Sequence, residues 1–252
     1  MQSKAALTKK DFVAVLGSAI FLLANLAATG SGGRERAKRT VCLANLKHLT
    51  LAWHLYADDN DDRIVNGDTE EYPALHEGQC PWVRRDWQPG MTVQSKKRAI
   101  ENGALFPYTR EFNLYKCPTG ARQETRSYTI VDAMNCQGWE SMGGVMISKR
   151  AQISKPTQRF VFLDHGGSEQ ALLGGWTCYV NEYRWWDPPA IRHDYGTTFS
   201  FADGHCECWK WQDKRTIEFG RNARPFSAPQ PGNEDIRRTQ LAAWGSAAIR
   251  GN

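Results

Sequence analysis

The sequence predicts an α+β protein in which a long N-terminal helix, first apolar and then amphipathic, packs against an antiparallel β-sheet head. The helix is predicted by residues 12–56, which carry apolar side chains at helical spacing. The sheet is predicted by short apolar and aromatic runs after residue 62, separated by Gly, Pro and Asn. With 252 residues, 41% hydrophobic composition and 10 Trp, the chain can bury a core, which excludes a disordered protein.

The charge is unevenly distributed. The chain carries 32 Lys and Arg against 27 Asp and Glu, a net charge of +5. The first 40 residues hold seven Lys or Arg and two Asp or Glu, so they account for the whole excess, and the rest of the chain is neutral. Because a nucleic-acid-binding domain normally carries a basic face, the sequence predicts no nucleic-acid partner.

The first element is an apolar segment, residues 12–28, within 22 uncharged residues that end at Gly33. A helix of about 20 residues spans a bilayer core, so the segment predicts a membrane-spanning helix. Phe12, Leu16, Phe21 and Leu26 are the apolar residues that represent this predicted membrane helix. A cleaved secretory signal, with basic residues before the apolar run, and a buried core helix are the two alternative interpretations.

The second element continues the helix through residues 34–62. Apolar residues recur at steps of three and four without a Pro up to Tyr56, and the acidic run 58–62 then ends the helix. The predicted organisation is a leader and membrane segment at 1–33, this amphipathic helix at 34–62, a head at 63–225, and a Pro-rich linker with a short helix at 226–252.

The head is predicted to contain strands at 159–163 and 176–183, and a hairpin formed by 197–202 and 205–211. Asp203 and Gly204 form its two-residue turn, because both residue types tolerate positive φ. Residues 225–231 read as a linker. Asn233 is an N-cap, and acidic residues follow it in the first turn, so residues 233–244 predict a C-terminal helix.

Three segments together resemble bacterial prepilin-like proteins, the pseudopilins of type II secretion and type IV pili. They are RERAKRTVCLANLKHLTLAWHLYADDND, FNLYKCPTGARQETRSYTI and RHDYGTTFSFADGHCECWKW. The last contains a motif in which His193 is followed after nine residues by Asp203 and Gly204. The chain departs from the family pattern at Asp11, where prepilins carry Gly, and at Leu16, where they carry Glu, so we predict that the N-terminus is not cleaved.

The resemblance implies a pilin-like fold and a non-enzymatic structural protein. It implies a single-pass protein of the inner membrane, held in the lipid bilayer by its N-terminal helix, with its head facing the periplasm or the cell exterior. Its expected partners are like subunits or other pseudopilins, bound through the same helix. It also places Cys42 near Cys117, which predicts a disulfide between them, and seven Cys are consistent with an oxidising exterior.

A calcium site is one alternative use of the acidic run. Asp58, Asn60 and Asp62 have the alternating oxygen spacing of a calcium loop, although Arg63 stands where such a loop needs Gly. The other interpretation is a solvated turn that ends the helix.

A zinc or manganese site is a second alternative. Asp164, His165, His193, Asp203 and His205 carry suitable ligand atoms. If His193, Asp203 and His205 converged with an open position, the protein would be an extracytoplasmic metal-dependent hydrolase. The structural alternative is that Asp203 serves the hairpin turn and His193 bonds a loop carbonyl.

The tryptophans leave a third alternative, a carbohydrate-binding surface module. Trp185, Trp186, Trp209 and Trp211 would stack on sugar rings, whereas indoles more often fill cores and interfaces. No Gly-rich phosphate loop, nucleophile elbow or paired-carboxylate motif occurs in the sequence. The sequence therefore predicts a protein without catalytic residues and without a bound cofactor.

Overall fold

The computed structural model describes residues 9, 15–18, 30–70, 73–121, 124–166, 174–222 and 224–249. The chain divides into two compact units, residues 1–37 and 38–252. In the first unit, residues 15–18 are helical and helix α2 (Ser31–Asp59) begins. The second unit contains the rest of α2, the sheet and the C-terminal helices.

The predicted membrane helix requires a correction. None of the helices in the described ranges has both the length and the apolarity that crossing a bilayer requires. This finding contradicts the predicted transmembrane segment and the predicted single-pass location in the inner membrane. Of the segment 12–28, only 15–18 is described, so Phe12, Phe21, Leu26 and the cleavage position lie outside the described residues.

Helix α2 confirms the predicted helix, and it ends close to the expected place. The positive φ angles of Asp61 (53°) and Asp62 (64°) turn the chain away just after its last residue. Its inward side chains follow steps of four and three and are buried: Cys42, Leu46, Leu49, Trp53 and Tyr56. Apolar residues are also exposed on the opposite side of α2. The helix is therefore less strictly amphipathic than the sequence predicted.

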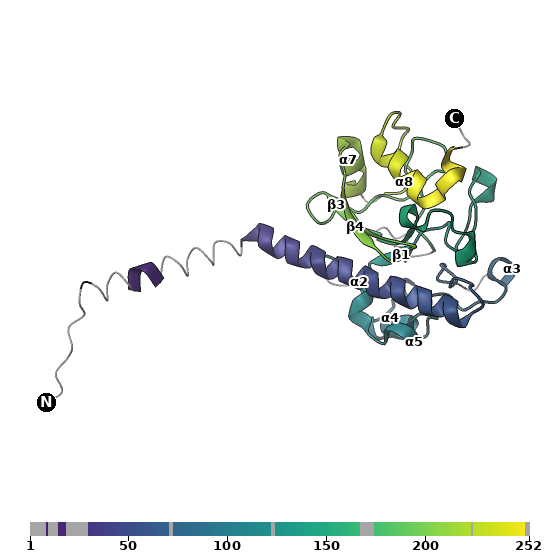
Figure 1. Cartoon of the computed structure of the whole chain (residues 1–252), viewed down its shortest axis with the longest axis horizontal. Helices are drawn as coiled ribbons and strands as arrows, with labels where there is room; N and C mark the ends of the chain where they lie inside the picture. The colour runs from purple at the N-terminus through teal and green to yellow at the C-terminus, as the bar shows by residue number, and fades with distance from the viewer. Residues whose placement is uncertain are drawn as a thin grey trace. The chain divides into compact units, whose positions relative to one another are not determined.

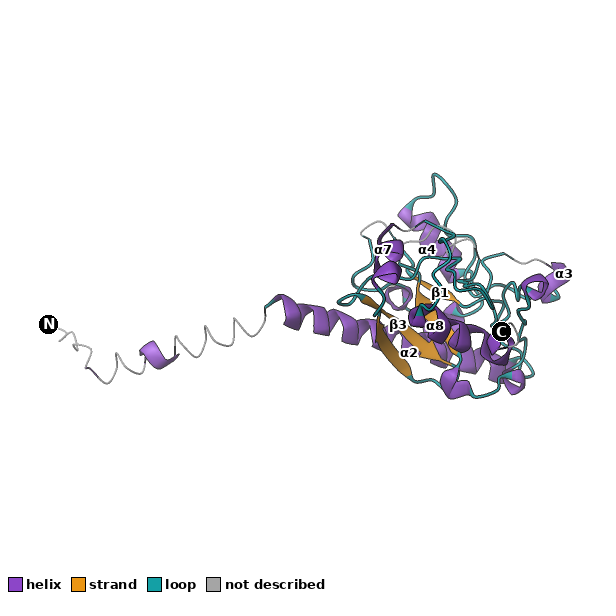
Figure 2. Ribbon diagram, turned by 90° about the horizontal axis from the view of Figure 1, so that it is seen from above, coloured by secondary structure: helices purple, strands orange, loops and turns teal. Residues whose placement is uncertain are grey.

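The sheet is antiparallel and confirms the predicted α+β class. Its four strands are β1 (Tyr128–Ile130), β2 (Phe160–Asp164), β3 (Gly196–Phe201) and β4 (Cys206–Lys210), in the order β1-β2-β3-β4. Helix α2 runs along one side of the sheet, and α8 (Glu234–Trp244) lies on the other (Figures 1 and 2). Strand β3 is buried along its whole length because both of its faces are covered.

The core behind the sheet is aromatic. The rings of Phe160 and Phe199 stack with centroids 4.0 Å apart, and Trp209 packs 5.0 Å from both. Each such pair adds roughly 0.5–1.5 kcal/mol beyond simple burial. Alternation along β3 thus directs Phe199 and Phe201 to this side and leaves Thr198 and Ser200 to face α2.

The predicted hairpin is confirmed as β3 and β4, but its turn is one residue longer. Phe201 N donates to His205 O at 2.9 Å, so the loop comprises Ala202, Asp203 and Gly204. Gly204 has φ +92°, the left-handed position of a three-residue hairpin loop. The position of the turn was therefore predicted correctly, but its length of two residues was wrong.

Two other expectations are wrong. The region after residue 62 contains helices α3 (Pro73–His76), α4 (Val93–Glu101) and α5 (Phe106–Thr109) instead of strand-like runs alone. The predicted strand at 176–183 reduces to one bridge, Val131 with Trp176. There the indole of Trp176 is buried and donates to Pro188 O, so the segment packs inward as a loop.

The C-terminal helix is confirmed. Asn233 caps α8, and its side-chain oxygen accepts from Asp235 N at 2.9 Å and from Ile236 N at 3.4 Å. A further helix, α7 (Lys214–Asn222), precedes it and was not predicted. Between them, the Pro-rich stretch is hydrogen-bonded to residues 183–186 through Phe226, Ser227 and Gln230.

Candidate functional site

Four side chains meet inside the second unit: Cys42, Cys117, Asp164 and His193. Their ligand atoms, two sulfurs, one oxygen and one nitrogen, all lie within 4.8 Å of one another. All four residues are buried, with at most 2% of any of them exposed. We call this group the Cys–Asp–His cluster.

The sheet register explains why Asp164 belongs to the cluster. Phe160 pairs with Phe201 but Leu163 pairs with Phe199, so β2 contains a bulge that moves its later residues to the other face. Asp164, which pairs with Tyr128 of β1, consequently points toward α2. The Tyr128 hydroxyl donates to Cys42 Sγ at 3.0 Å, and Thr198 Oγ1 of β3 lies 2.9 Å from the same sulfur.

A strained loop holds His193. His193, Asp194 and Tyr195 have φ angles of 47°, 64° and 65°, three consecutive non-glycine residues in the left-handed region. Arg192 and Gly196 close this loop with two backbone hydrogen bonds of 2.8 and 2.7 Å. Each such residue costs on the order of 1 kcal/mol, and such strain concentrates at functional sites.

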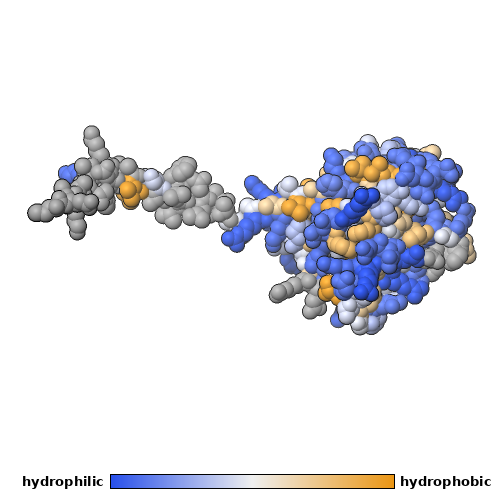
Figure 3. All heavy atoms as spheres, turned by 90° about the horizontal axis from the view of Figure 1, so that it is seen from below, coloured by the Kyte–Doolittle hydropathy of each residue, from blue (hydrophilic) through white to orange (hydrophobic). Residues whose placement is uncertain are grey.

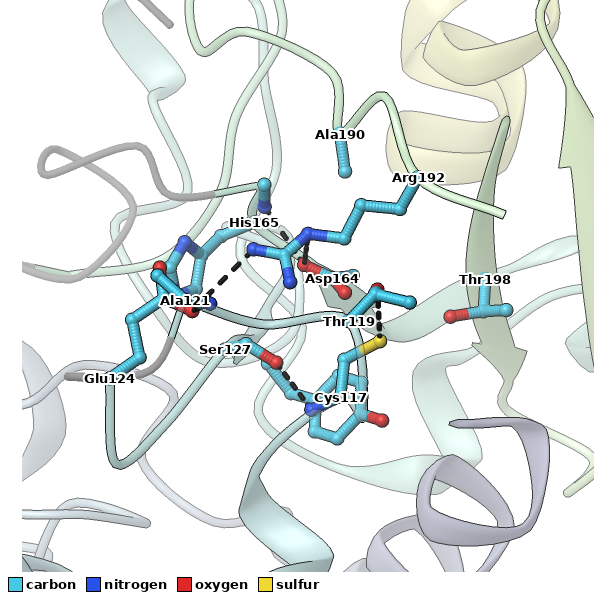
Figure 4. A network of polar contacts seen from close by, with 12 residues as sticks. Cys117, Thr119, Ala121, Glu124, Ser127, Asp164, His165, Ala190, Arg192 and Thr198 are labelled. Atoms are coloured by element: carbon cyan, nitrogen blue, oxygen red, sulfur yellow. Dashed lines mark hydrogen bonds and ion pairs between the residues drawn. The ribbon is translucent and has the colours of Figure 1, made fainter. Parts of the chain in front are cut away.

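Cys117 enters from the loop that follows the short helix η1 (Phe112–Tyr115). Its backbone N donates to Ser127 Oγ at 2.7 Å, which fixes the loop beside β1. Its sulfur lies 3.2 Å from His193 Nε2 and 3.0 Å from Thr119 Oγ1. Figure 4 shows Cys117 with Ser127 and Thr119 as its hydrogen-bond partners.

Arg192 supplies the neighbouring positive charge. Its guanidinium lies between Asp164 Oδ1, at 3.3 Å, and Glu124 Oε2, at 3.5 Å (Figure 4). Gly166 N also donates to Asp164 Oδ1, at 2.9 Å. The other oxygen, Oδ2, is buried and makes no hydrogen bond within the described part of the chain. A carboxylate oxygen of Asp164 is among the ligand atoms of the cluster.

The electrostatics favour one thiolate. Hydrogen bonding from Cys42, and then from His193 and Thr119, lowers the pKa of the Cys117 thiol. Burial raises the pKa of Cys42, and it raises the pKa of Asp164 to about 8. Without a bound ion, these shifts favour protons on Cys42 and Asp164 and a negative charge on Cys117 at neutral pH.

Three uses of this arrangement are chemically reasonable: a nucleophilic thiolate beside an imidazole, a disulfide, or a metal centre. Complete burial of Cys117 argues against a nucleophile, because a substrate must reach the sulfur. The seven cysteines, all within the described residues, form no disulfide in this structure, Cys42 and Cys117 included. The disulfide between these neighbouring residues stays a prediction.

The sequence had named all four residues, but in separate groups. Asp164 and His193 were candidate metal ligands, whereas Cys42 and Cys117 were a disulfide candidate. The structure brings the two groups together. It places Asp203 and His205 elsewhere, at the exposed hairpin loop, where the imidazole Nδ1 is 2.5 Å from the carboxylate. His165 is also buried near the cluster, but its Nε2 faces Arg126 O at 3.3 Å.

The candidate calcium ligands hold an arginine instead. Arg150 Nη2 lies 2.6 Å from Asp58, and its Nε lies 2.8 Å from Asp62, which also accepts from Ala151 N at 2.9 Å. The bond from Ala151, followed by that from Arg150, lowers the pKa of Asp62. Asn60 turns its amide to Tyr56 O. The three side chains therefore serve the end of α2.

The candidate sugar-stacking tryptophans pack against other side chains of the protein. Trp185 and Trp211 are buried in the core. Trp209 lines a surface cavity of about 530 Å³ together with Phe201, but the guanidinium of Arg238 covers its ring at 4.8 Å from the centroid. Trp186 packs against Trp139 and Phe226. These contacts give the indoles packing roles.

The outward side of α2 is a second feature of interest. Val41, Ala44, His48, Leu51 and Leu55 are exposed and follow steps of three, four, three and four. Val41 is 48% exposed, Leu51 55% and Leu55 41%. This spacing is that of a coiled-coil seam, and the five residues are called the α2 stripe below.

No protein-family model matches the chain, and neither the curated proteins nor the solved structures include one significantly similar to it. The resemblance to pseudopilins therefore stays a prediction from the three sequence segments.

Proposed function

We propose that this chain is a non-enzymatic structural subunit, related to the pseudopilins of type II secretion and type IV pili, that assembles with copies of itself through the α2 stripe. The observation that carries the proposal is the heptad spacing of exposed apolar residues on a helix whose other side is already packed on the sheet. A long N-terminal helix packed on an antiparallel sheet is also the arrangement expected of a pilin-like fold.

The energetics support a pairing of like helices. Leu51 and Leu55 are each about half exposed, so covering the remainder contributes roughly 1 kcal/mol per side chain. In a symmetric pair, each stripe covers the other, because the two surfaces are identical. The face seen in Figure 3 carries orange apolar areas among blue polar ones.

The charges along α2 favour a second copy of the same helix. Its first half contains Arg34, Arg36, Lys38 and Arg39, and its C-terminal end contains Asp58 and Asp59. In an antiparallel or a staggered pair, the basic half of one helix meets the acidic end of the other. Asp58 also pairs with Arg150 of its own chain, and Asp59 accepts from Tyr108 OH.

The test is a double variant of the full chain, Leu51→Glu with Leu55→Glu. Sedimentation velocity over a range of concentrations should show association of the unaltered protein and a monomer for the variant, with the same circular dichroism spectrum. Val93→Glu is the matched control, since Val93 is 57% exposed and belongs to α4, not to the stripe. Association that survives in the double variant, or that is lost equally in the control, would refute the proposal.

A further inference from the structure

We propose that the Cys–Asp–His cluster binds one zinc ion through Cys42 Sγ, Cys117 Sγ, Asp164 Oδ2 and His193 Nε2. Two thiolates, an imidazole and a carboxylate are ordinary zinc ligands, with bond lengths of about 2.0–2.3 Å. A tetrahedral centre with these bonds has ligand atoms roughly 3.3–3.8 Å apart. The four ligand atoms already lie within 4.8 Å of one another, and Cys117 Sγ is 3.2 Å from His193 Nε2.

The charges of the site suit a divalent cation. Zinc binds the deprotonated forms of these ligands, so any protons that they carry pass to solvent, four coordinate bonds form, and no electron is transferred. Two thiolates, one carboxylate and Zn²⁺ leave a net charge of −1. Arg192 lies 3.3 Å from Asp164 Oδ1 and 3.5 Å from Glu124 Oε2, so its positive charge is shared between these two carboxylates. An isolated buried charge is costly, so a cation among these anionic groups is favourable.

The surrounding hydroxyls fit the same conclusion. Tyr128 OH donates to Cys42 Sγ, and Thr198 Oγ1 and Thr119 Oγ1 lie 2.9 and 3.0 Å from Cys42 and Cys117. Hydroxyl donors of this kind stabilise the negative sulfurs of a metal centre. Asp164 Oδ2, buried without a hydrogen bond in the described residues, gains in the zinc ion the partner that it otherwise lacks.

Burial determines the role of the ion. A catalytic zinc keeps one position open for water, whereas four buried protein ligands make a closed structural centre. The ion would join α2, the loop after η1, the end of β2 and the left-handed loop before β3. Those ligands come from segments up to about 150 residues apart in the chain, so a single ion ties the helix to the sheet. This inference is independent of the proposed self-association.

The test is elemental analysis of the full chain, produced with zinc in the medium and dialysed against metal-free buffer. We expect one zinc per chain, released when an organomercurial caps the thiols and detected with a chromogenic chelator. Cys117→Ser should abolish stoichiometric zinc. Cys206→Ser, a half-buried cysteine of β4 outside the cluster, should retain it.

Thr198→Val is a second test, which remains informative if Cys117→Ser does not fold. It keeps the side-chain shape and removes only the hydroxyl near Cys42, so zinc affinity should fall about 10–100-fold. Cobalt substituted into the unaltered protein should show the absorption of a tetrahedral, thiolate-ligated ion. Zinc-free protein, unchanged affinity in Thr198→Val, or a Cys42–Cys117 disulfide in non-reducing peptide maps would each overturn the proposal.

Discussion

The buried ion pair between Arg126 and Asp86 is the most informative place to perturb the head. Arg126 is 1% exposed and Asp86 4%. The guanidinium donates from Nε to Asp86 Oδ2 at 2.9 Å and from Nη2 to Oδ1 at 2.8 Å. It also donates from Nη1 to Tyr128 O at 3.0 Å and lies 5.3 Å from the ring of Trp82. The pair thus fastens the loop before β1 to residues 82–86.

Asp86→Ala removes the carboxylate that accepts two hydrogen bonds from this buried guanidinium and so breaks a buried ion pair. The expected loss is about 3–5 kcal/mol of the free energy of unfolding, a large share of the roughly 5–15 kcal/mol typical of a domain. For a chain of this size, that lowers the melting temperature by roughly 10 °C. The double variant Asp86→Leu with Arg126→Met replaces both charges with apolar groups and should recover most of the loss.

Guanidinium chloride unfolding, followed by tryptophan fluorescence, measures these free energies. The single variants Asp86→Leu and Arg126→Met complete the double-mutant cycle and give the coupling energy between the two side chains. A loss below about 1 kcal/mol in Asp86→Ala, or a double variant less stable than both single variants, would show that the guanidinium is hydrated and not buried as described.

Three further changes test separate parts of the structure. Asn233→Ala removes the α8 cap and leaves its partner Thr216 unbonded, so the free energy of unfolding should fall by about 2 kcal/mol in urea titrations; a change near zero contradicts the cap. Burial raises the pKa of Asp132 to about 6, so the folded chain keeps a proton that the unfolded chain loses. Stability should therefore fall by roughly 3 kcal/mol as the pH rises from about 4 to 6, and Asp132→Asn should flatten that part of the curve; parallel curves refute the assignment. Gly196→Ala places a Cβ 2.1 Å from Trp209 O, so thermal melting should show a loss of about 1–3 kcal/mol or more, and an unchanged melting temperature would mean that β3 and β4 separate easily.

Local patterns in the sequence determined most of the secondary structure around the site. The periodicity of residues 34–56 predicted most of α2, the apolar run before Asp164 predicted β2, and Asn233 predicted the start of α8. These signals act over a few residues, through side-chain spacing and hydrogen bonds to the nearest backbone groups. The apolar run at 12–28 shows the limit of such counting, since no described helix has the character predicted for it.

Only the tertiary structure decided which residues share the buried cluster. Cys117 and His193 are 76 residues apart, and Cys42 and Thr198 are 156 apart, so no local pattern links them. The bulge in β2 turns Asp164 toward α2, and a strict alternation of two would have placed it on the other face. The left-handed backbone conformation of His193, Asp194 and Tyr195 could not be predicted from the sequence either, because non-glycine residues adopt it in succession only where the surrounding packing enforces it. The sequence supplies the two cysteines, the aspartate and the histidine of the cluster. Their side chains come together only because β2 contains a bulge and a strained loop carries His193.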